Sequence, residues 1–401
     1  EDKVYLVNGP VNLSRIQEIY NLVERTDLKF KPFKQGYPAS LPANSDLFAV
    51  LRKQDVLLHH PYHSFSPVID FIKQAATDPT VLAIKQTLYR TGSKSPIVDA
   101  LVVASKAGKE VTVVIELRAR FDEAENVALA SRLQQAAVHV VYGIVGYKTH
   151  AKMLLVLRRE NNKLRRYAHL GTGNYHRSTS RIYTDYGFLT SDKQITEDVS
   201  HLFVQLTSLG KVPKTNKLLH APFTLMDGLL SRIEREIANV EAGKSGHIIA
   251  KVNALVEPTM ISAFYRASMA GVKIDLIVRG ICCLKPGIEG LSENIQVRSI
   301  IGRFLEHTRI YYFKNDEEPE VWAASADLMK RNLLRRVEAC FPIQPKQLRQ
   351  QVIDDLHVYL VDNVQAWQLA ADGRYQRIEK ESETETMCAQ SRLLEQMAKT
   401  Y

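Results

Sequence analysis

One histidine pattern occurs twice in this chain, and this repetition constrains the fold more than any other feature. His150-Ala151-Lys152 opens a strand-like apolar run and is followed by Thr172-Gly173-Asn174. His307-Thr308-Arg309 opens a second such run and is followed by Ser325-Ala326-Asp327. The two copies lie roughly 160 residues apart, a length typical of one domain. The repetition predicts two related halves that share one site.

The repeat extends beyond the histidines. Residues 104–108, Ala-Ser-Lys-Ala-Gly, lead to an apolar run that ends in Arg118, and residues 267–271, Ala-Ser-Met-Ala-Gly, lead to one that ends in Arg279. Acidic residues also follow at equal intervals of eleven residues, Asp185 after Asn174 and Glu338 after Asp327. Each element alone is a weak signal. Their shared order indicates an ancient duplication.

The charge of the chain narrows the class of partner. Its 53 Lys and Arg residues outnumber 44 Asp and Glu, which gives a net charge of +9. This surplus favours a polyanionic partner, such as nucleic acid, an acidic membrane surface or a phosphate polymer. The four cysteines show no metal-ligand spacing and indicate a reducing cytoplasm. We expect neither a signal peptide nor a membrane-spanning helix, because no apolar stretch reaches the length that a bilayer requires.

Apolar periodicity divides the chain into three parts. Residues 1–36 contain an amphipathic helix pattern, Leu13–Arg25, and we expect them to be the remnant of a preceding helical domain and its linker in a longer protein. Residues 37–217 and 218–401 each alternate strand and helix patterns, which favours a layered α/β domain. The predicted fold class is two α/β/α domains related by duplication, with a short helical remnant in front.

The expected elements follow from the same patterns. Strands are predicted in the first domain over residues 81–85, 111–117, 138–142, 152–157 and 167–171. In the second domain they are predicted over residues 248–253, 274–279, 295–299, 308–313, 321–324 and 339–343. Helices are predicted over residues 122–135, 226–241, 345–353 and 382–399.

The residue types in the first copy suit phosphoryl transfer. His150 and Lys152 lie two residues apart in a predicted strand, so their side chains share a face. A neutral imidazole nitrogen can attack phosphorus, and the phosphoramidate that forms remains reactive. Lysine can bind a phosphate oxygen meanwhile, and Thr172 and Asn174 can supply hydrogen bonds from a neighbouring strand end.

The duplicated motif resembles the phospholipase D superfamily, in which two His-x-Lys motifs meet at a pseudo-twofold interface and one histidine forms a phospho-enzyme. That family carries an aspartate five residues after the lysine, where this chain has Leu157 and Lys314. Arg309 also replaces the lysine of the second copy. These departures argue against an ordinary phosphodiesterase.

Longer segments are similar to the bacterial polyphosphate kinase family over essentially the whole chain. The matching segments are residues 88–91, 117–121, 147–153, 171–175, 279–282 and 304–307. The resemblance corresponds to the two C-terminal, phospholipase D-like domains of that family. It implies that His150 takes the terminal phosphoryl group of ATP as phosphohistidine and passes it reversibly to polyphosphate. His307 would contact ATP and assist as an acid or base.

The resemblance also implies further site residues and a cofactor. Tyr183 and Arg279 match positions that contact the nucleotide, together with His307. Arg90 and Arg120 match positions at magnesium-bound phosphates, and we expect them to act through phosphate oxygens because a guanidinium has no lone pair for Mg²⁺. Additional phosphate contacts are predicted for Lys152, Asn174, Arg118 and Arg309.

The expected partners are therefore ATP, ADP and inorganic polyphosphate, without nucleic acid, in a homo-oligomeric full-length enzyme. A cytoplasmic location is expected, compatible with peripheral association with the inner membrane. Two alternatives stay open. One is a phospholipase D-type phosphodiesterase acting on lipid or nucleic acid. The other is a non-catalytic polyanion-binding module that uses the basic cluster of Arg158, Arg159, Lys163, Arg165 and Arg166.

Overall fold

The computed structural model describes residues 4–89, 95–116, 123–144, 146–208, 214–378 and 385–398. The chain forms two compact units, residues 1–34 and 35–401. The smaller unit holds the helix α1, Gln17–Leu22, between two 3₁₀ turns, Leu13–Ile16 and Thr26–Leu28. The prediction of one helix over Leu13–Arg25 is therefore wrong in its bounds. None of the described residues in this unit is buried, so packing adds little to such a short helix.

The first sheet of the larger unit has the strand order β1-β8-β7-β6-β2-β3-β4. Strands β2, β3 and β4 run parallel, whereas β1, β8, β7 and β6 are joined in antiparallel pairs. The bounds are β1 Val56–His60, β2 Val81–Leu88, β3 Glu110–Ile115, β4 His139–Val141, β6 Lys152–Glu160, β7 Lys163–Gly171 and β8 Tyr183–Thr190.

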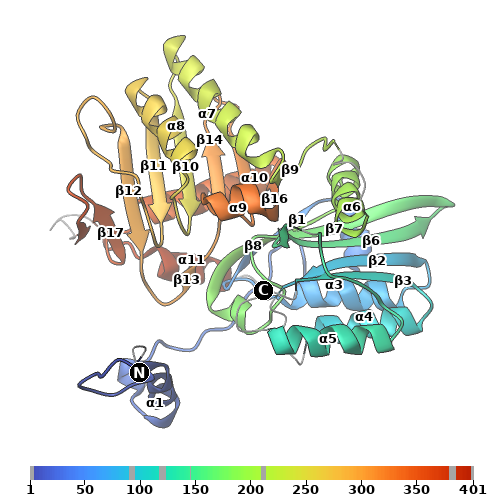
Figure 1. Ribbon diagram of the computed structural model, residues 1–401. Coiled ribbons are helices and arrows are strands. Elements are labelled where there is room, and N and C mark those ends of the chain that lie inside the picture. The colour runs from blue at the N-terminus through green and yellow to red at the C-terminus, as the bar shows by residue number, and fades with distance from the viewer. Residues whose placement is uncertain are drawn as a thin grey trace. The chain divides into compact units, whose positions relative to one another are not determined.

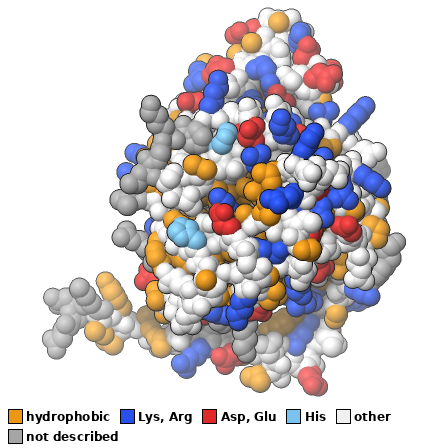
Figure 2. All heavy atoms as spheres, turned by 90° about the vertical axis from the view of Figure 1, so that its right-hand side faces the viewer, with side chains coloured by type: hydrophobic (Ala, Val, Ile, Leu, Met, Phe, Trp, Pro, Cys, Tyr) orange, Lys and Arg blue, Asp and Glu red, His pale blue; other side chains and the backbone are white. Residues whose placement is uncertain are grey.

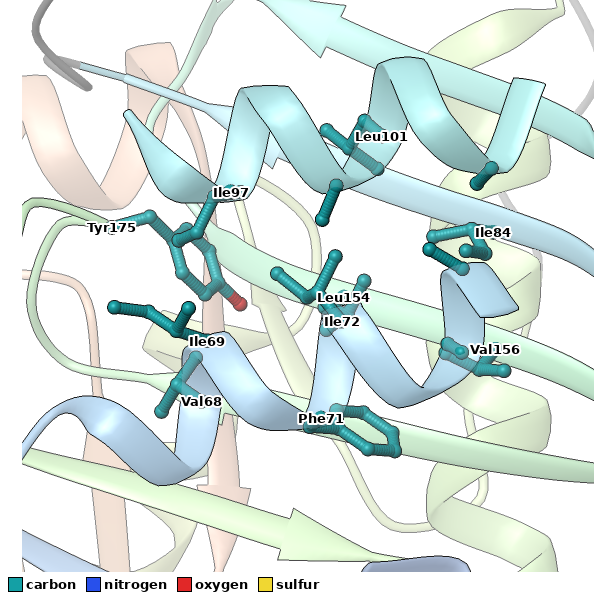
Figure 3. Close-up of a cluster of buried hydrophobic side chains, with 14 of the residues drawn as sticks. Val68, Ile69, Phe71, Ile72, Ile84, Ile97, Leu101, Leu154, Val156 and Tyr175 are labelled. Carbon is teal, nitrogen blue, oxygen red and sulfur yellow. The ribbon is translucent and has the colours of Figure 1, made fainter. Parts of the chain in front are cut away.

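Helices cover both faces of this sheet (Figure 1). The helices are α2 Leu47–Leu51, α3 Ser66–Thr77, α4 Pro96–Lys106, α5 Glu123–Gln135 and α6 Lys193–Thr207. Helices α3, α4 and α5 lie on one side and α6 on the other. Apolar residues at helical spacing make this possible: Ile72 of α3 and Leu101 of α4 point toward Leu154 of β6 in one buried cluster (Figure 3).

The second sheet has the order β18-β17-β12-β11-β10-β14-β15-β16-β5, with β9 beside β16. The bounds are β9 Leu219–Ala221, β10 His247–Val252, β11 Lys273–Val278, β12 Ile295–Ile300, β14 Ile310–Phe313, β15 Glu320–Ala324, β16 Arg336–Pro342, β17 Ala366–Leu369 and β18 Tyr375–Arg377.

Helices α7, Leu225–Glu241, and α8, Pro258–Met269, cover one face of this second sheet. Their buried side chains, such as Leu229 and Phe264, join those of β10 and β11 in a second core. The remaining helices are α9 Lys330–Arg335, α10 Lys346–Leu360 and α11 Ala389–Ala398. The prediction of two layered α/β halves is confirmed. No helix among the described residues is long and apolar enough to span a bilayer.

The parts of the chain before and after the predicted boundary at residue 217, named the first and second halves, exchange short strands. Strand β5, Lys148–Thr149, comes from the first half but pairs in parallel with β16 of the second sheet. Strand β13, Leu305–Glu306, comes from the second half but pairs in parallel with β8 of the first sheet. The residue after each exchanged strand is a motif histidine. The exchange therefore brings both motifs to the junction between the halves.

Candidate active site

His150 is held by the opposite half. Its backbone N–H and that of Ala151 both donate to the Val337 carbonyl, each at 2.9 Å. Its Nδ1 lies 2.8 Å from Oε2 of Glu338, the residue that follows Val337 on β16. Since β5 pairs Thr149 with Val337, His150 and Glu338 fall at the next register position. The exchanged strand thus places imidazole and carboxylate face to face.

Glu338 is fully buried, and donors surround it. The Ser325 hydroxyl donates to Oε2 and the Asn332 amide donates to Oε1 at 2.7 Å. Burial raises the pKa of Glu338, but His150, Lys152 and Ser325 lower it by more, so the carboxylate is ionised. An ionised carboxylate only accepts, and hence Nδ1 of His150 carries the proton.

The unprotonated nitrogen of His150 is therefore Nε2. Burial lowers the pKa of His150 to about 3, against the opposing attraction of Glu338, so the ring is neutral near pH 7. Tyr89 packs edge-on against the ring, with centroids 5.1 Å apart. A neutral imidazole with a fixed tautomer and one available lone pair is a competent nucleophile.

His307 repeats this construction in the opposite direction. Its Nδ1 lies 2.8 and 2.9 Å from the two carboxylate oxygens of Asp185, on β8 of the first half. The Thr172 hydroxyl donates to the same carboxylate at 2.6 Å. A Cβ atom at Gly173 would overlap this carboxylate, so the motif loop needs glycine at this point. Each half therefore supplies the carboxylate that orients the other half's histidine.

Arg309 lies against His307, with Nη1 3.1 Å from its Nε2. Its Nε and Nη2 donate to the two oxygens of Asp327 at 3.1 and 3.0 Å. Burial and the positive charge of Arg309 lower the pKa of His307. The buried guanidinium, predicted as a phosphate contact, is thus bonded to Asp327 and to the second histidine.

Lys152 is also buried. Its ammonium donates to the His150 carbonyl and lies 5.5 Å from the Tyr89 ring centre. Burial lowers the pKa of Lys152 to about 7, although Glu338 opposes this shift. The lysine therefore lies beside the first histidine, as its position in the motif predicts.

The predicted nucleotide contacts converge on His307. The Tyr183 ring lies 5.2 Å from the His307 ring, measured between centroids. Arg279 donates from Nη1 to the Glu306 carbonyl at 3.0 Å. Asn174 lies in the loop that also carries Thr172 and Gly173. Three predicted arginines, Arg90, Arg118 and Arg120, lie outside the described residues.

The described residues do not form a protein-only site for magnesium. Within them, no three or more His, Cys, Asp or Glu side chains are grouped so that they could hold a metal ion. The two carboxylates at the junction, Asp185 and Glu338, already accept hydrogen bonds from the histidines. A magnesium ion here would depend on phosphate oxygens for its ligands.

A cleft of about 770 Å³ opens beside β5. The first half lines it with Glu116, Tyr142, Ile144, Tyr147 and Lys148, and the second with Arg331, Arg335 and Arg336. Arg336 pairs with Lys148 across β16 and β5, two residues before His150, and its charge contributes to lowering the pKa of that histidine. The cleft gathers positive charge close to His150.

Sequence reasoning noted Asp185 and Glu338 without assigning them a function. The signal that could have found them was their equal spacing of eleven residues after Asn174 and Asp327. The arginines of the cleft gave no comparable signal. Arg331 and Arg335 lie in a short helix, α9, and Arg336 follows it, and the position of this helix at the junction is set by the fold.

The structure is a two-part α/β fold with paired histidines at its junction, in agreement with the predicted fold class. The structure of a phosphatidylserine synthase from Haemophilus influenzae superposes with a TM-score of 0.53 at 11% identity, over 92% of this chain and 95% of that one, a likeness of fold alone. A polyphosphate kinase structure from Porphyromonas gingivalis superposes with a TM-score of 0.86 at 35% identity, over 94% of this chain and 58% of that one.

Sequence comparison gives the family. Residues 46–212 match the family model of polyphosphate kinase C-terminal domain 1, and residues 218–390 match that of C-terminal domain 2. A polyphosphate kinase from Pseudomonas aeruginosa is 57% identical over 398 residues, which cover 99% of this chain and 58% of the relative. The chain therefore belongs to the polyphosphate kinase family, as its motifs predicted, and spans somewhat more than half the length of that relative.

Proposed function

We propose that this chain carries the phosphoryl-transfer centre of a polyphosphate kinase, which moves the terminal phosphoryl group of ATP reversibly to inorganic polyphosphate. The observation that supports this proposal best is that His150 is neutral and has an unprotonated Nε2, because Glu338 of the other half binds its Nδ1–H. The relatives are named polyphosphate kinases, which supports ATP and polyphosphate as the substrates. We also propose that the boundaries between the parts lie near residues 36 and 217.

The reaction needs two in-line displacements. In the first, Nε2 of His150 attacks the terminal phosphorus of ATP, the bond to the bridging oxygen breaks and ADP leaves. In the second, a terminal oxygen of polyphosphate attacks the phosphorus, and the P–N bond breaks to return the neutral imidazole. Glu338 stabilises the positive charge that develops on the ring in both steps.

The second histidine would serve the nucleotide. Asp185 holds the Nδ1 proton of His307 as Glu338 holds that of His150, so Nε2 of His307 can accept or return a proton once the Arg309 guanidinium, 3.1 Å away, turns to the phosphates. Tyr183 and Arg279 lie beside it and would contact the base and phosphates. Lys152 and Asn174 would bind oxygens of the transferring group.

The basic cleft suits the polyphosphate chain. Arg331, Arg335 and Arg336 line it on one side and Lys148, two residues before His150, on the other. Magnesium would enter with ATP and screen the charge of its phosphates, whose oxygens Arg90 and Arg120 would contact, and Arg118 would add a further phosphate contact. We further propose a cytoplasmic homo-oligomer for the full-length protein.

The structure weakens the basis of the binding-module alternative. Arg158 and Arg165 of the basic cluster form ion pairs with Glu160, and Arg158 also pairs with Asp78. Figure 2 shows Lys and Arg side chains interspersed with Asp and Glu over the face that lies on the right of Figure 1. Non-specific polyanion binding also needs no paired histidines.

The test is covalent labelling of the intact protein with ATP labelled on its terminal phosphate. Acid-labile, base-stable label should form on His150 and pass to added polyphosphate. It should be lost in His150→Ala and kept in His139→Ala, a control at an exposed histidine of β4. Absence of label from wild-type protein with magnesium, together with hydrolysis of a model phosphodiester, would establish the phosphodiesterase instead.

A further inference from the structure

A small cavity lies inside the first half, bordered by the motif loop. Its volume of about 10 Å³ is close to what a single water molecule requires. His60 of β1, His169 of β7 and Asn174 of the loop line it, together with Asp185 and Gly187 of β8. Both histidines are only 3% exposed. The cavity therefore lies directly beside the carboxylate that orients His307.

Three polar atoms of this lining have no hydrogen-bond partner in the described part of the chain. They are Nε2 of His60, Nε2 of His169 and Oδ1 of Asn174. Buried polar atoms are nearly always paired, with protein or with ordered water. Three unpaired atoms around one cavity point to a ligand that forms hydrogen bonds.

The other ring nitrogens fix what the two imidazoles can offer. Nδ1 of His60 lies 2.9 Å from the His63 carbonyl, which only accepts, so this nitrogen is protonated and Nε2 is an acceptor. Nδ1 of His169 lies 2.8 Å from the Tyr175 hydroxyl. That hydroxyl is 3.4 Å from the His169 carbonyl, too far for a good O–H···O bond, so it donates to Nδ1 instead.

His169 therefore presents a protonated Nε2 to the cavity. Burial lowers the pKa of His60 to about 4 and that of His169 to about 3, so both rings are neutral near pH 7. The lining thus offers one donor, His169 Nε2–H, and two acceptors, His60 Nε2 and Asn174 Oδ1. A metal cation does not fit, because the His169 proton points at the position it would take.

The absent side chain of Gly187 creates the space. A Cβ atom there would lie 2.7 Å from Nε2 of His169 and 3.5 Å from Nε2 of His60. Both nitrogens thus face the same spot above this glycine. One water can accept from His169 and donate to both His60 and Asn174, which satisfies all three atoms at once.

We propose that this cavity binds one water molecule as a fixed part of the active-site framework. The water connects Asn174 of the motif loop to strands β1 and β7. Thr172 of the same loop donates to Asp185, and Asp185 orients His307. The water thereby fixes the loop whose Thr172 hydroxyl binds this carboxylate. The inference rests on the lining alone and stands whether or not the proposed reaction is correct.

A high-resolution crystal structure of the intact protein, with anomalous data at transition-metal edges, tests the occupant. We expect one ordered peak without anomalous signal, within hydrogen-bond distance of all three atoms. Contacts with neither histidine, or an anomalous peak, would overturn the proposal. Long-range ¹H–¹⁵N spectra of histidine-labelled protein provide a second test: His60 should be the Nδ1–H tautomer and His169 the Nε2–H tautomer. Two Nδ1–H tautomers would contradict the inference.

A variant tests the position. Gly187→Ala should displace the water and disorder residues 172–174, whereas the exposed control His139→Gln should leave both unchanged. A Gly187→Ala structure that keeps the water between the two histidines would overturn the assignment. If this variant does not fold, the crystal and the spectra of the wild-type protein still decide.

Discussion

His150 and Glu338 form a 2.8 Å hydrogen bond, although they lie on different halves of a duplicated fold and 188 positions apart in sequence. The exchanged strand β5 creates this pairing by adding to the sheet that carries Glu338. His307 and Asp185 repeat the relationship through β13. In both pairs the carboxylate that binds the histidine belongs to the other half.

The bond predicts the effect of Glu338→Gln. The change removes the ionised acceptor that fixes the His150 tautomer and stabilises the charged ring, so phosphohistidine formation should slow by roughly 10- to 100-fold. Rapid-quench single-turnover labelling with ATP measures this rate. Glu320→Gln, whose carboxylate pairs with Arg232 and Arg235, is a control with a normal rate. A Glu338→Gln rate equal to wild type would rule out the orienting role.

Gly173→Ala should damage the second histidine. The new Cβ would overlap the Asp185 carboxylate, and the resulting loop shift should cost about 1–3 kcal/mol of stability. We expect weaker ATP binding by calorimetry together with slower labelling. In the control Gly108→Ala, at a φ of +81°, the Cβ meets open space, so stability falls while ATP binding stays normal. Equal ATP affinity in both variants would contradict this account.

Stability should fall as pH decreases below about 6.5. Burial lowers the folded-state pKa of His150 and His169 to about 3 and that of His60 to about 4. Between these values and the unfolded value near 6.5, the unfolded chain binds protons that the folded chain does not, and each histidine contributes up to about 1.4 kcal/mol per pH unit. Urea unfolding at pH 7, 6 and 5 measures the slope.

Single substitutions separate the contributions of individual histidines to this pH dependence. His169→Gln should reduce the slope of unfolding free energy against pH by about one proton, while His139→Gln, at an exposed site, should leave it unchanged. A free energy of unfolding that does not change between pH 6.5 and 5 in the wild-type protein would mean that these rings are protonated in the folded state.

The cleft arginines should affect the acceptor more than the donor. Arg335→Ala removes positive charge from the proposed polyphosphate path, so the KM for polyphosphate should rise several-fold and depend less on salt. His150 labelling by ATP should stay close to wild type. Arg374→Ala, at a side chain with 82% exposure, is the matched control. An unchanged KM in Arg335→Ala would place the acceptor elsewhere.

The sequence predicted the secondary-structure elements that have a regular apolar pattern and the site residues that belong to a repeated motif. Apolar runs indicated the main strands, such as those around Val113 and Leu276, and the repeated motif indicated a shared site at His150 and His307. Strands β5 and β13 have two residues each, too few for any pattern, so the exchange between halves was not predictable. The roles of Asp185 and Glu338 depend on that exchange. The pairing of strands from different halves, which no local sequence pattern indicates, therefore sets the roles of these two carboxylates.

The exchange of strands also bears on how such a protein could originate. A single half lacks the carboxylate for its own histidine, so a one-domain ancestor could complete the arrangement only as a pair of identical subunits. Fusion of two copies would keep each histidine beside its partner at any protein concentration and free the copies to diverge. Lys152 in one copy and Arg309 in the other record such divergence. Any selection for the activity of such a site would therefore also preserve the contact between the halves.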